Sequence, residues 1–331
     1  MSYVVAIVGA TGVVGREILA TLERRHFPVS HLVALSSPRS AGTTLTFRAQ
    51  PVVVESVSAR SFDGVDIALF SAGAAASRQY APQAAASGAV VIDNSSAWRC
   101  DPQVPLVVPE VNAYQIRHRP RGIIANPNCS TIQLVVALKP LYDLERIEHI
   151  VVSTYQSVSG KGHEATKELW ENTRALASGQ VVAPKVFPGQ IAMNLISDWP
   201  DGGEDYSEEE WKMVRETRKI FADDAIGVSP TTVRVPVAVG HAEAVWVRFR
   251  RAVTVQQAKE ALRNAPGIQL VDEPYAPGNP TQPLRAAGTD SVYVSRLRRD
   301  LASPQALMMW IVADNLRKGA ALNAVQIAEA L

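Results

Sequence analysis

The sequence predicts an α/β fold with two domains, the first a parallel sheet wound with helices and the second of α+β type. In the first third of the chain, short apolar runs alternate with segments of helical character, which is the pattern of strand–helix–strand units. After Cys129 the elements lose this regular alternation. The chain has 331 residues, of which 47% are hydrophobic, so it has enough apolar surface for two cores.

The first domain is expected over residues 1–128, completed by a C-terminal helix over 312–331. That helix belongs to a final helical stretch, roughly 308–331, which is apolar on a wide face. Apolar runs bounded by turn residues predict strands, and a 3.6-residue period predicts helices. The strand-like runs are 3–8, 31–35, 65–70 and 89–92, and the helical segments are 14–25 and 77–87.

A glycine-rich loop lies between the first strand and the first helix and reads Gly9-Ala10-Thr11-Gly12-Val13-Val14-Gly15. Glycines let the backbone turn tightly, approach a pyrophosphate and pack the helix against the strand. A plain strand-to-helix turn would also accommodate this spacing, which departs from the commoner G-x-G-x-x-G. Its place after the first strand favours a dinucleotide-binding loop in a Rossmann-like domain, with candidate contacts at Gly9, Thr11, Gly12, Val13, Val14 and Gly15.

The loop after the second strand indicates which dinucleotide is bound. A site for NAD usually offers an acidic residue to the ribose 2′-hydroxyl, and the stretch 35–42 contains none. It offers Ser37, Arg39 and Ser40 instead, whose hydroxyls and guanidinium suit a 2′-phosphate. The alternative is a solvated polar loop that happens to contain an arginine. We therefore expect NADP as the cofactor.

The second domain is expected over residues 129–311 and carries the most informative residue. Cys129 stands immediately before an apolar run, 131–138, that Pro140 should end, so the sequence predicts a thiol at a helix N-terminus. Backbone N–H groups and the helix dipole there stabilise a thiolate and an oxyanion. A lone cysteine is also often a small buried hydrophobe. The other expected elements are strands at 149–158, 231–239 and 244–250 and helices at 166–177 and 207–221.

Composition limits the possible partners and compartment. The net charge is +1 with no long basic block, so nucleic acid and acidic membrane surfaces are not expected as partners, and small molecules are. Two cysteines cannot form a disulfide framework, and no apolar run reaches about 18 residues. The start lacks a charged region before its apolar stretch. We expect a cytoplasmic protein without a metal site.

A series of motifs follows along the chain, at 9–15, 37–40, 93–99, 126–130, 154–162, 216–219, 234–243 and 314–329. Taken in order, they resemble the aspartate-β-semialdehyde dehydrogenase family over essentially the whole chain. Asn-Cys-Ser-Thr, Tyr-Gln-Ser-Val-Ser-Gly and Arg-x6-His occur together in few other families. The resemblance implies NADPH-dependent reductive dephosphorylation of L-aspartyl-4-phosphate to aspartate semialdehyde through a cysteine thioester, in the synthesis of lysine, methionine, threonine and diaminopimelate.

By this resemblance Cys129 is the nucleophile, His241 the acid–base group and Gln156 the amide that positions the acyl group or His241. Arg234 would bind the α-carboxylate, on a strand that forms a hairpin-like segment with that of His241. The remaining substrate contacts would be Glu216 to the ammonium and Lys219 and Arg99 to the phosphate. Each residue also has a plain structural explanation: a core histidine, a strand-capping glutamine, a surface arginine or a salt-bridged helix face.

The resemblance further implies a homodimer and additional cofactor contacts at Ser71, Gly73, Asn128, Ser159, Gly160 and Asn315. Two residues depart from the family pattern: Lys161 replaces a small residue and Ala242 replaces a serine. Two other functions were weighed. One is an N-acetyl-γ-glutamyl-phosphate reductase, which typically has Pro-Gly-Cys where this chain has Pro127-Asn128-Cys129. The other is a non-catalytic NADP-sensing protein, which would have no need of the catalytic set.

Overall fold

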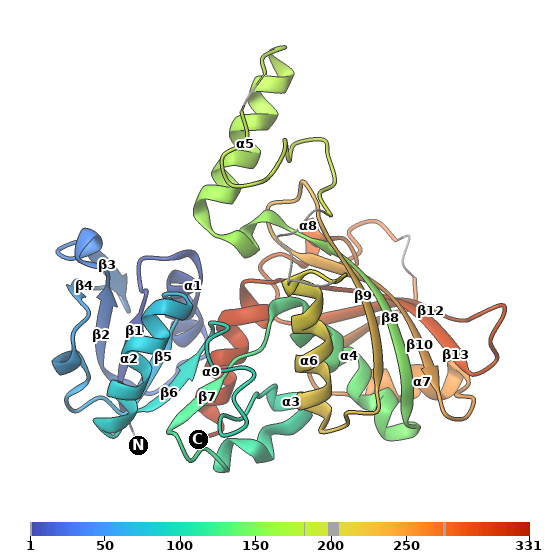
Figure 1. Ribbon diagram of the computed structural model, residues 1–331, viewed down its shortest axis with the longest axis horizontal. Helices are drawn as coiled ribbons and strands as arrows, with labels where there is room; N and C mark the ends of the chain where they lie inside the picture. The colour runs from blue at the N-terminus through green and yellow to red at the C-terminus, as the bar shows by residue number, and fades with distance from the viewer. Residues whose placement is uncertain (1, 182, 198–204, 274–275) are drawn as a thin grey trace. The chain divides into compact units, whose positions relative to one another are not determined.

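The computed structural model describes residues 2–181, 183–197, 205–273 and 276–331 (Figure 1). The chain divides into two compact units. Unit 1 holds Met1–Asn128 together with Ala320–Leu331, and unit 2 holds Cys129–Gly319. Each unit has its own sheet, and the class predicted from the sequence is confirmed.

Unit 1 is built on a seven-stranded sheet in the order β3-β4-β2-β1-β5-β6-β7. All neighbouring strands are parallel except β3 and β4. The strand–helix alternation predicted from the sequence is present, because the buried apolar strands need helices on both faces. The strands are β1 (Tyr3–Val8), β2 (Val29–Ser36), β3 (Thr44–Phe47), β4 (Gln50–Ser56), β5 (Ile67–Phe70), β6 (Val90–Asp93) and β7 (Ile123–Ala125), and the α-helices are α1 (Val13–Arg24), α2 (Ala74–Ala86), α3 (Pro109–Asn112) and α9 (Leu322–Glu329).

The C-terminal segment returns to unit 1 but is helical only in its last part. Val325 and Ile327 of α9 lie in the same core as Ile7 of β1 and Leu22 of α1. Residues 306–313, predicted in part as helix, form strand β13 (Ala306–Ala313) in the middle of the second sheet. Periodicity cannot separate a continuous apolar run in a buried strand from one in a buried helix, which explains the wrong prediction.

Unit 2 contains a six-stranded mixed sheet in the order β11-β12-β13-β10-β8-β9. One face of this sheet is covered by α4, which packs against β8, β10, β12 and β13 and against α6 and α7. The strands are β8 (Ile147–Gln156), β9 (Gly227–Arg234), β10 (His241–Phe249), β11 (Ile268–Val271), β12 (Val292–Arg299) and β13, and the α-helices are α4 (Cys129–Leu144), α5 (His163–Ala177), α6 (Glu208–Phe221), α7 (Val255–Arg263) and α8 (Pro283–Ala286).

Two predictions about unit 2 are wrong in detail. Helix α4 does not end at Pro140 but continues to Leu144. The helix is buried on nearly every side, and this packing outweighs the backbone hydrogen bond lost at the proline. Strands β9 and β10 do not form a hairpin, since β8 lies between them, parallel to β9 and antiparallel to β10. The last residue of β9 and the first residue of β10 still lie at the same end of the sheet, on either side of the last residues of β8.

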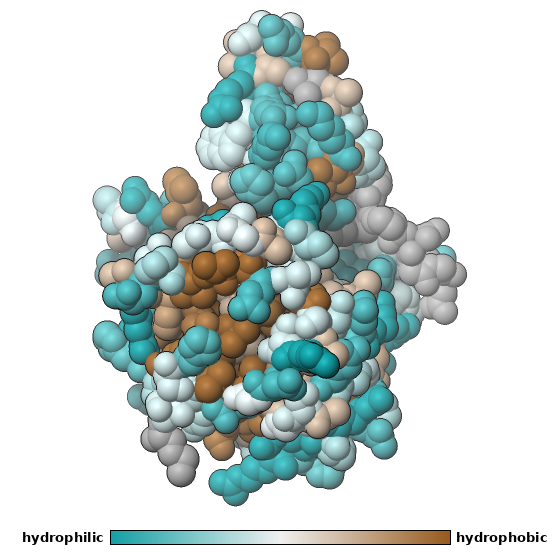
Figure 2. Space-filling view, turned by 90° about the vertical axis from the view of Figure 1, so that its left-hand side faces the viewer, coloured by the Kyte–Doolittle hydropathy of each residue, from teal (hydrophilic) through white to brown (hydrophobic). Residues whose placement is uncertain are grey.

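Helix α5 buries one side and exposes the other. Ala165 and Leu169 pack with Phe187 and Ile191 in a small core of their own. The outer surface of this region, at the top of Figure 2, is mostly hydrophilic. Within the described residues, no helix is long and apolar enough to cross a membrane.

Candidate active site

Cys129 is the first residue of α4, as the sequence predicts. The rest of the first turns of this helix, including Ser130, Thr131 and Ile132, is buried. The free backbone N–H groups at a helix start and the dipole of the helix stabilise negative charge on a sulfur placed there. Cys129 is only partly exposed, whereas Cys100, in unit 1, is exposed and reduced.

His241 opens β10 and reaches this sulfur. Its side chain is fully buried, and Nε2 lies 3.2 Å from Sγ of Cys129. Burial, followed by the positive charge of Arg234, lowers the pKa of His241 to about 3. The imidazole is therefore neutral at physiological pH. The geometry brings together the two residues that sequence analysis assigned to nucleophile and acid–base group.

Buried polar groups contact the His241 ring on the side of Nδ1, away from Cys129. The main-chain N–H of Ser157 donates to Nδ1 at 3.0 Å, and the Ser157 hydroxyl lies 3.1 Å from the same nitrogen. The Asn315 carbonyl Oδ1 accepts hydrogen bonds from the hydroxyls of Ser157 and Ser159 and from the N–H of Gly240. Ser159 and Asn315, predicted from the sequence as cofactor contacts, thus belong to the hydrogen-bond network around Ser157, which contacts His241.

Gln156 lies at the end of β8, on the face of the sheet that α4 covers. Its Nε2 donates to the Ser130 hydroxyl at 2.8 Å and to Glu209 Oε1 at 3.5 Å. The amide is therefore fixed beside the residue that follows Cys129. This placement suits the predicted role of positioning an acyl group.

Arg234 ends β9 opposite Gln156 in the parallel register. Only 4% of it is exposed, and Nη1 donates to the main-chain oxygen of Ser157 at 2.6 Å. Burial lowers the pKa of Arg234, while the charges of Glu209 and Cys129 raise it. A Cβ added at Gly160 would lie 3.1 Å from Nη1 and 3.5 Å from His241 Nε2, so glycine here keeps the space beside both side chains.

The acidic helix α6 contributes a pair that sequence analysis missed. Ser207 and Glu210 form a capping box, which fixes the first turn, and Glu209 lies in that turn. Glu209 is the carboxylate whose charge acts on Arg234 and His241, and Lys212 pairs with it at 3.1 Å. Glu209 and Lys212 have the same three-residue spacing as the predicted pair.

The predicted pair Glu216 and Lys219 lies two turns further along α6, about 10 Å along the axis at 1.5 Å per residue. Glu216 is only 2% exposed. A seven-residue shift keeps the same helix face but moves along its axis, so the spacing alone could not select the correct turn. We therefore reassign the pair: Glu209 is the carboxylate that reaches Gln156 and acts on Arg234, Lys212 is paired with it, and Glu216 and Lys219 lie two turns away.

The two departures from the family pattern have different surroundings. Lys161 follows Gly160 and places its ammonium over the ring of Phe187, 5.7 Å from the centroid. Burial and the nearby Arg234 charge lower its pKa. Ala242 belongs to an apolar cluster with Tyr293 and Val312 on the other face of the sheet, so it does not face the Cys129–His241 pair.

A second buried carboxyl lies on the same face of β10 as His241. Glu243 is fully buried beside Gln133, which is one turn beyond Cys129 on α4. The Gln133 amide is the polar group beside this carboxyl, and their interaction lowers the pKa of Glu243 less than burial raises it. Burial raises the pKa of Glu243 well above its usual value, which favours the protonated, uncharged form of this carboxyl.

In unit 1 the glycine loop has the close contacts that a nucleotide cradle requires. Gly9 has a φ of +90°, and a Cβ there would lie 2.8 Å from the main-chain carbon of Ser71. A Cβ at Gly15 would lie 2.2 Å from the Gly9 oxygen, so helix α1 approaches the loop as closely as the motif predicts. Thr11 contacts the Ser36 hydroxyl at 3.0 Å.

The other predicted residues of unit 1 lie at the carboxyl ends of its strands. Ser37 and Arg39 are exposed in a turn that follows β2, and Gly73 precedes α2 with a φ of +84°. Arg99 is buried and donates to the main-chain oxygens of Asn94 and Asn126, which follow β6 and β7. Ligands of parallel α/β sheets bind at this edge. The glycine cradle and the polar groups at this edge therefore fit a nicotinamide dinucleotide.

Comparisons with known proteins agree with this geometry. A model of the semialdehyde dehydrogenase NAD binding domain matches residues 4–119, and a model of the semialdehyde dehydrogenase dimerisation domain matches residues 138–318. An aspartate-semialdehyde dehydrogenase of Aquifex aeolicus is 52% identical over 336 residues, covering 100% of this chain and 98% of the relative. The chain belongs to the aspartate-semialdehyde dehydrogenase family.

Other relatives and solved structures support the same family. The aspartate-semialdehyde dehydrogenase of Bacillus subtilis is 47% identical, covering 99% of this chain and 96% of the relative. The crystal structure of aspartate semialdehyde dehydrogenase II complexed with ASA from Vibrio cholerae superposes with a TM-score of 0.95 at 48% identity, covering 100% of this chain and 98% of that one. The dimerisation model falls within unit 2, and the NAD binding model falls within unit 1.

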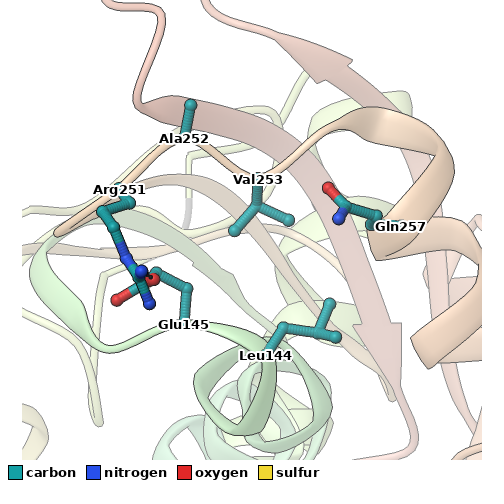
Figure 3. Close-up of a pocket in the computed structure, with 6 residues that line it drawn as sticks. All are labelled: Leu144, Glu145, Arg251, Ala252, Val253 and Gln257. Carbon is teal, nitrogen blue, oxygen red and sulfur yellow. Dashed lines mark hydrogen bonds and ion pairs between the residues drawn. The ribbon is translucent and has the colours of Figure 1, made fainter.

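A surface depression of about 300 Å³ lies away from this family site (Figure 3). Residues from the end of α4 and from the segment that leads into α7 line it, and Glu145 pairs there with Arg251 at 2.6 Å. Leu144, which lines it, is about 22 Å along α4 from Cys129 at 1.5 Å per residue. In the part of the chain that the structure describes, no group of three or more His, Cys, Asp or Glu residues is arranged to hold a metal.

Proposed function

We propose that this chain catalyses the reversible, NADPH-dependent reductive dephosphorylation of L-aspartyl-4-phosphate to L-aspartate 4-semialdehyde. The observation that carries the proposal is the 3.2 Å contact between His241 Nε2 and a cysteine sulfur at the start of α4. The family assignment and the relatives' names supply the substrate. The N-acetylglutamyl and NADP-sensing alternatives have no observation in their favour.

The reaction divides into acyl transfer and reduction. The Cys129 thiolate attacks the acyl carbon, a C–S bond forms, the bond to the phosphate oxygen breaks, and phosphate leaves. NADPH, when bound, supplies a hydride to the thioester carbon. The resulting oxyanion collapses, the C–S bond breaks, and the thiolate is regenerated as the aldehyde leaves. The helix start of α4 stabilises the thiolate throughout.

Four charged side chains are proposed to recognise the substrate. Arg234 binds the α-carboxylate through its guanidinium, which is fixed at one end by the Ser157 carbonyl. Glu209 binds the ammonium, because its carboxylate lies between Gln156 and Lys212. Lys212 binds the phosphate, and Arg99 of unit 1 is proposed as its second ligand.

The cofactor is proposed to be NADP and not NAD. Ser37, Arg39 and Ser40 follow β2 in a turn without a carboxylate, and Ser37 and Arg39 are exposed to solvent. A guanidinium and hydroxyls favour a 2′-phosphate, while the 2′-hydroxyl of NAD would have no acidic partner there. A related enzyme of Candida albicans, with 26% identity and a TM-score of 0.78, has been solved with NADP.

We also propose that the chain forms a homodimer through the sheet face that α4 leaves uncovered. On this face Val151 is 40% exposed, and it pairs across the strands with the half-buried Trp246. Exposed apolar side chains on a broad sheet suit a self-complementary interface. Unit 2 is also the part of the chain that matches the family's dimerisation model.

The assay that tests this function measures NADPH formation from aspartate semialdehyde with and without phosphate. We expect turnover that requires both NADP⁺ and phosphate, with NAD⁺ less efficient, because phosphate is the acceptor that releases the thioester. N-acetylglutamate semialdehyde serves as the competing substrate. Faster turnover of that substrate, or phosphate-independent turnover of aspartate semialdehyde at the same rate, would contradict the proposal.

A further inference from the structure

Cys129 and His241 both stand at the ends of their secondary-structure elements. Cys129 is the first residue of α4, and His241 is the first residue of β10. End residues of a helix lack part of its main-chain hydrogen bonding, and helix ends fray. The 3.2 Å distance between Sγ of Cys129 and Nε2 of His241 therefore depends on how the interiors of α4 and β10 are held against each other.

A second pair of side chains lies one step further inside the same two elements. Gln133 follows Cys129 by four residues on α4. Glu243 follows His241 by two residues on β10, and the Gln133 amide lies beside its carboxyl. Residues four apart share a helix face, and residues two apart share a strand face. Four helical residues advance about 6 Å and two strand residues about 6.6 Å, so the two pairs are successive contacts between α4 and β10.

Both side chains of this second pair are closed off from water. Glu243 is fully buried, and Gln133 is 1% exposed. In the sheet, Glu243 stands opposite Ile311 and Thr154, which are also fully buried. A buried carboxyl or amide without a partner costs free energy, which contact between the two groups offsets. A displacement of α4 along β10 would separate the two groups, so their contact favours one register of the helix on the strand.

We propose that Glu243 and Gln133 are positioning residues, whose contact sets the register of α4 on β10 and thereby holds Cys129 within reach of His241. A polar pair suits this task, because hydrogen bonds are directional and apolar contacts are not. A misplacement of about 1 Å in a reacting pair can cost about 100-fold in rate. The inference rests on the proposed function in one respect, which is that Cys129 and His241 carry out the chemistry.

Kinetics of three variants test the positioning role. Burial favours the uncharged carboxyl of Glu243, which glutamine mimics with a donor and an acceptor, whereas leucine offers neither. We expect Glu243→Leu to lower kcat about tenfold or more with KM for aspartate semialdehyde within about twofold, and Glu243→Gln to keep kcat at least about fivefold above Glu243→Leu. The control is Val245→Ala, which removes buried apolar groups two residues further along the same face and should leave kcat within about twofold. Equal kcat in Glu243→Leu and Glu243→Gln, or an equal loss in Val245→Ala, would overturn the proposal.

A double-mutant cycle tests whether the two residues act as one unit. We expect Gln133→Leu to lower kcat about as much as Glu243→Leu, and the double variant to lose no more than about threefold beyond either single variant. The double variant leaves neither polar group buried without its partner, so it keeps the test available where Glu243→Leu alone does not fold. A loss in the double variant equal to the product of the two single losses would show that the residues act separately.

Alkylation of Cys129 reads the same contact in the full-length enzyme without substrate or cofactor. Its rate with iodoacetamide is followed on the Cys129 peptide between about pH 6 and pH 9 in the parent and in Glu243→Leu. We expect the midpoint to move upward in the variant, toward the value of about 8.5 of an ordinary thiol, because the sulfur loses its His241 partner. An unmoved midpoint would overturn the positioning role. An upward shift in a protein whose parent does not turn over aspartate semialdehyde would support that role and overturn the proposed function alone.

Discussion

The sulfur of Cys129 lies at the N-terminus of α4 and 3.2 Å from Nε2 of His241. A helix dipole does not titrate, and burial lowers the pKa of His241 to about 3, so the imidazole is neutral at physiological pH. The positive potential that favours a thiolate at Cys129 therefore comes from the helix N-terminus and not from an imidazolium.

At the residue scale, the sharpest substrate prediction concerns Arg234. Arg234→Lys should lower kcat/KM for aspartate semialdehyde by about tenfold or more, because an ammonium cannot reproduce two parallel hydrogen bonds to a carboxylate, each worth roughly 1.5–3 kcal/mol. Steady-state kinetics measure this. A silent substitution, together with equal turnover of an analogue that lacks the α-carboxylate, would remove Arg234 from substrate binding.

Motifs predicted Cys129 and His241, but not how they meet. The residues are 112 positions apart, and their contact depends on α4 packing across the face of a sheet in which β10 is central. Ser157 was also beyond reach, because its contribution is a main-chain N–H, which no side-chain pattern reveals. The sequence identifies Lys161 and Ala242 as departures from the family pattern. Only the structure shows that Lys161 lies near Arg234 and that Ala242 is on the opposite face of the sheet.

At the element scale, α6 offers a matched pair of variants. Glu209→Gln should raise KM for aspartate semialdehyde by about tenfold, because an amide cannot pair with the substrate ammonium. Glu216→Gln, two turns further along the same face, should leave KM within about twofold. Steady-state kinetics of both variants test the corrected assignment. The reverse pattern would restore Glu216 to the site.

Strand β10 gives a prediction for stability against pH. Glu243 has a raised pKa, so between its usual value and this raised value the folded state holds a proton that the unfolded state releases. Its contribution to stability is full below pH 4.5 and falls as pH rises, by up to about 1.4 kcal/mol per pH unit. Glu243→Gln should therefore be more stable than the parent at pH 8 and lose this advantage toward pH 4.5.

Denaturant unfolding of the parent and of Glu243→Gln at a series of pH values measures this difference. The matched control is Glu164→Gln, an exposed carboxylate in the first turn of α5, for which no such pH-dependent gain is expected. A stability difference between Glu243→Gln and the parent that does not change with pH would show that the carboxyl titrates normally.

Element types were largely predictable, and the exceptions share one cause. Strand–helix alternation in unit 1 follows from apolar period and glycine placement. The strand at Ala306–Ala313 and the continuation of α4 through Pro140 were missed because both segments are buried on nearly every side. Full burial removes the polar positions from which periodicity is read, and packing then outweighs local propensity.

At the scale of the whole molecule, dimer formation should depend on the open sheet face of unit 2. Val151→Asp places a charge where Val151 is 40% exposed beside Trp246, and should raise the dimer dissociation constant by about tenfold or more. Val53→Asp, on β4 of unit 1 at 59% exposure, is the control and should leave it unchanged. Sedimentation over a concentration series distinguishes them, and equal behaviour would locate the interface elsewhere.

The central claim is that catalysis proceeds through a thioester on Cys129, and this acyl-enzyme can be detected directly. The enzyme is mixed with aspartate semialdehyde and NADP⁺ without phosphate, quenched in acid, digested and examined by mass spectrometry. We predict an aspartyl adduct on the peptide that contains Cys129, absent from the Cys100 peptide, lost on addition of phosphate and missing in Cys129→Ser. Phosphate-dependent turnover by Cys129→Ser at more than a tenth of the parent rate, or an adduct on Cys100 alone, would contradict it.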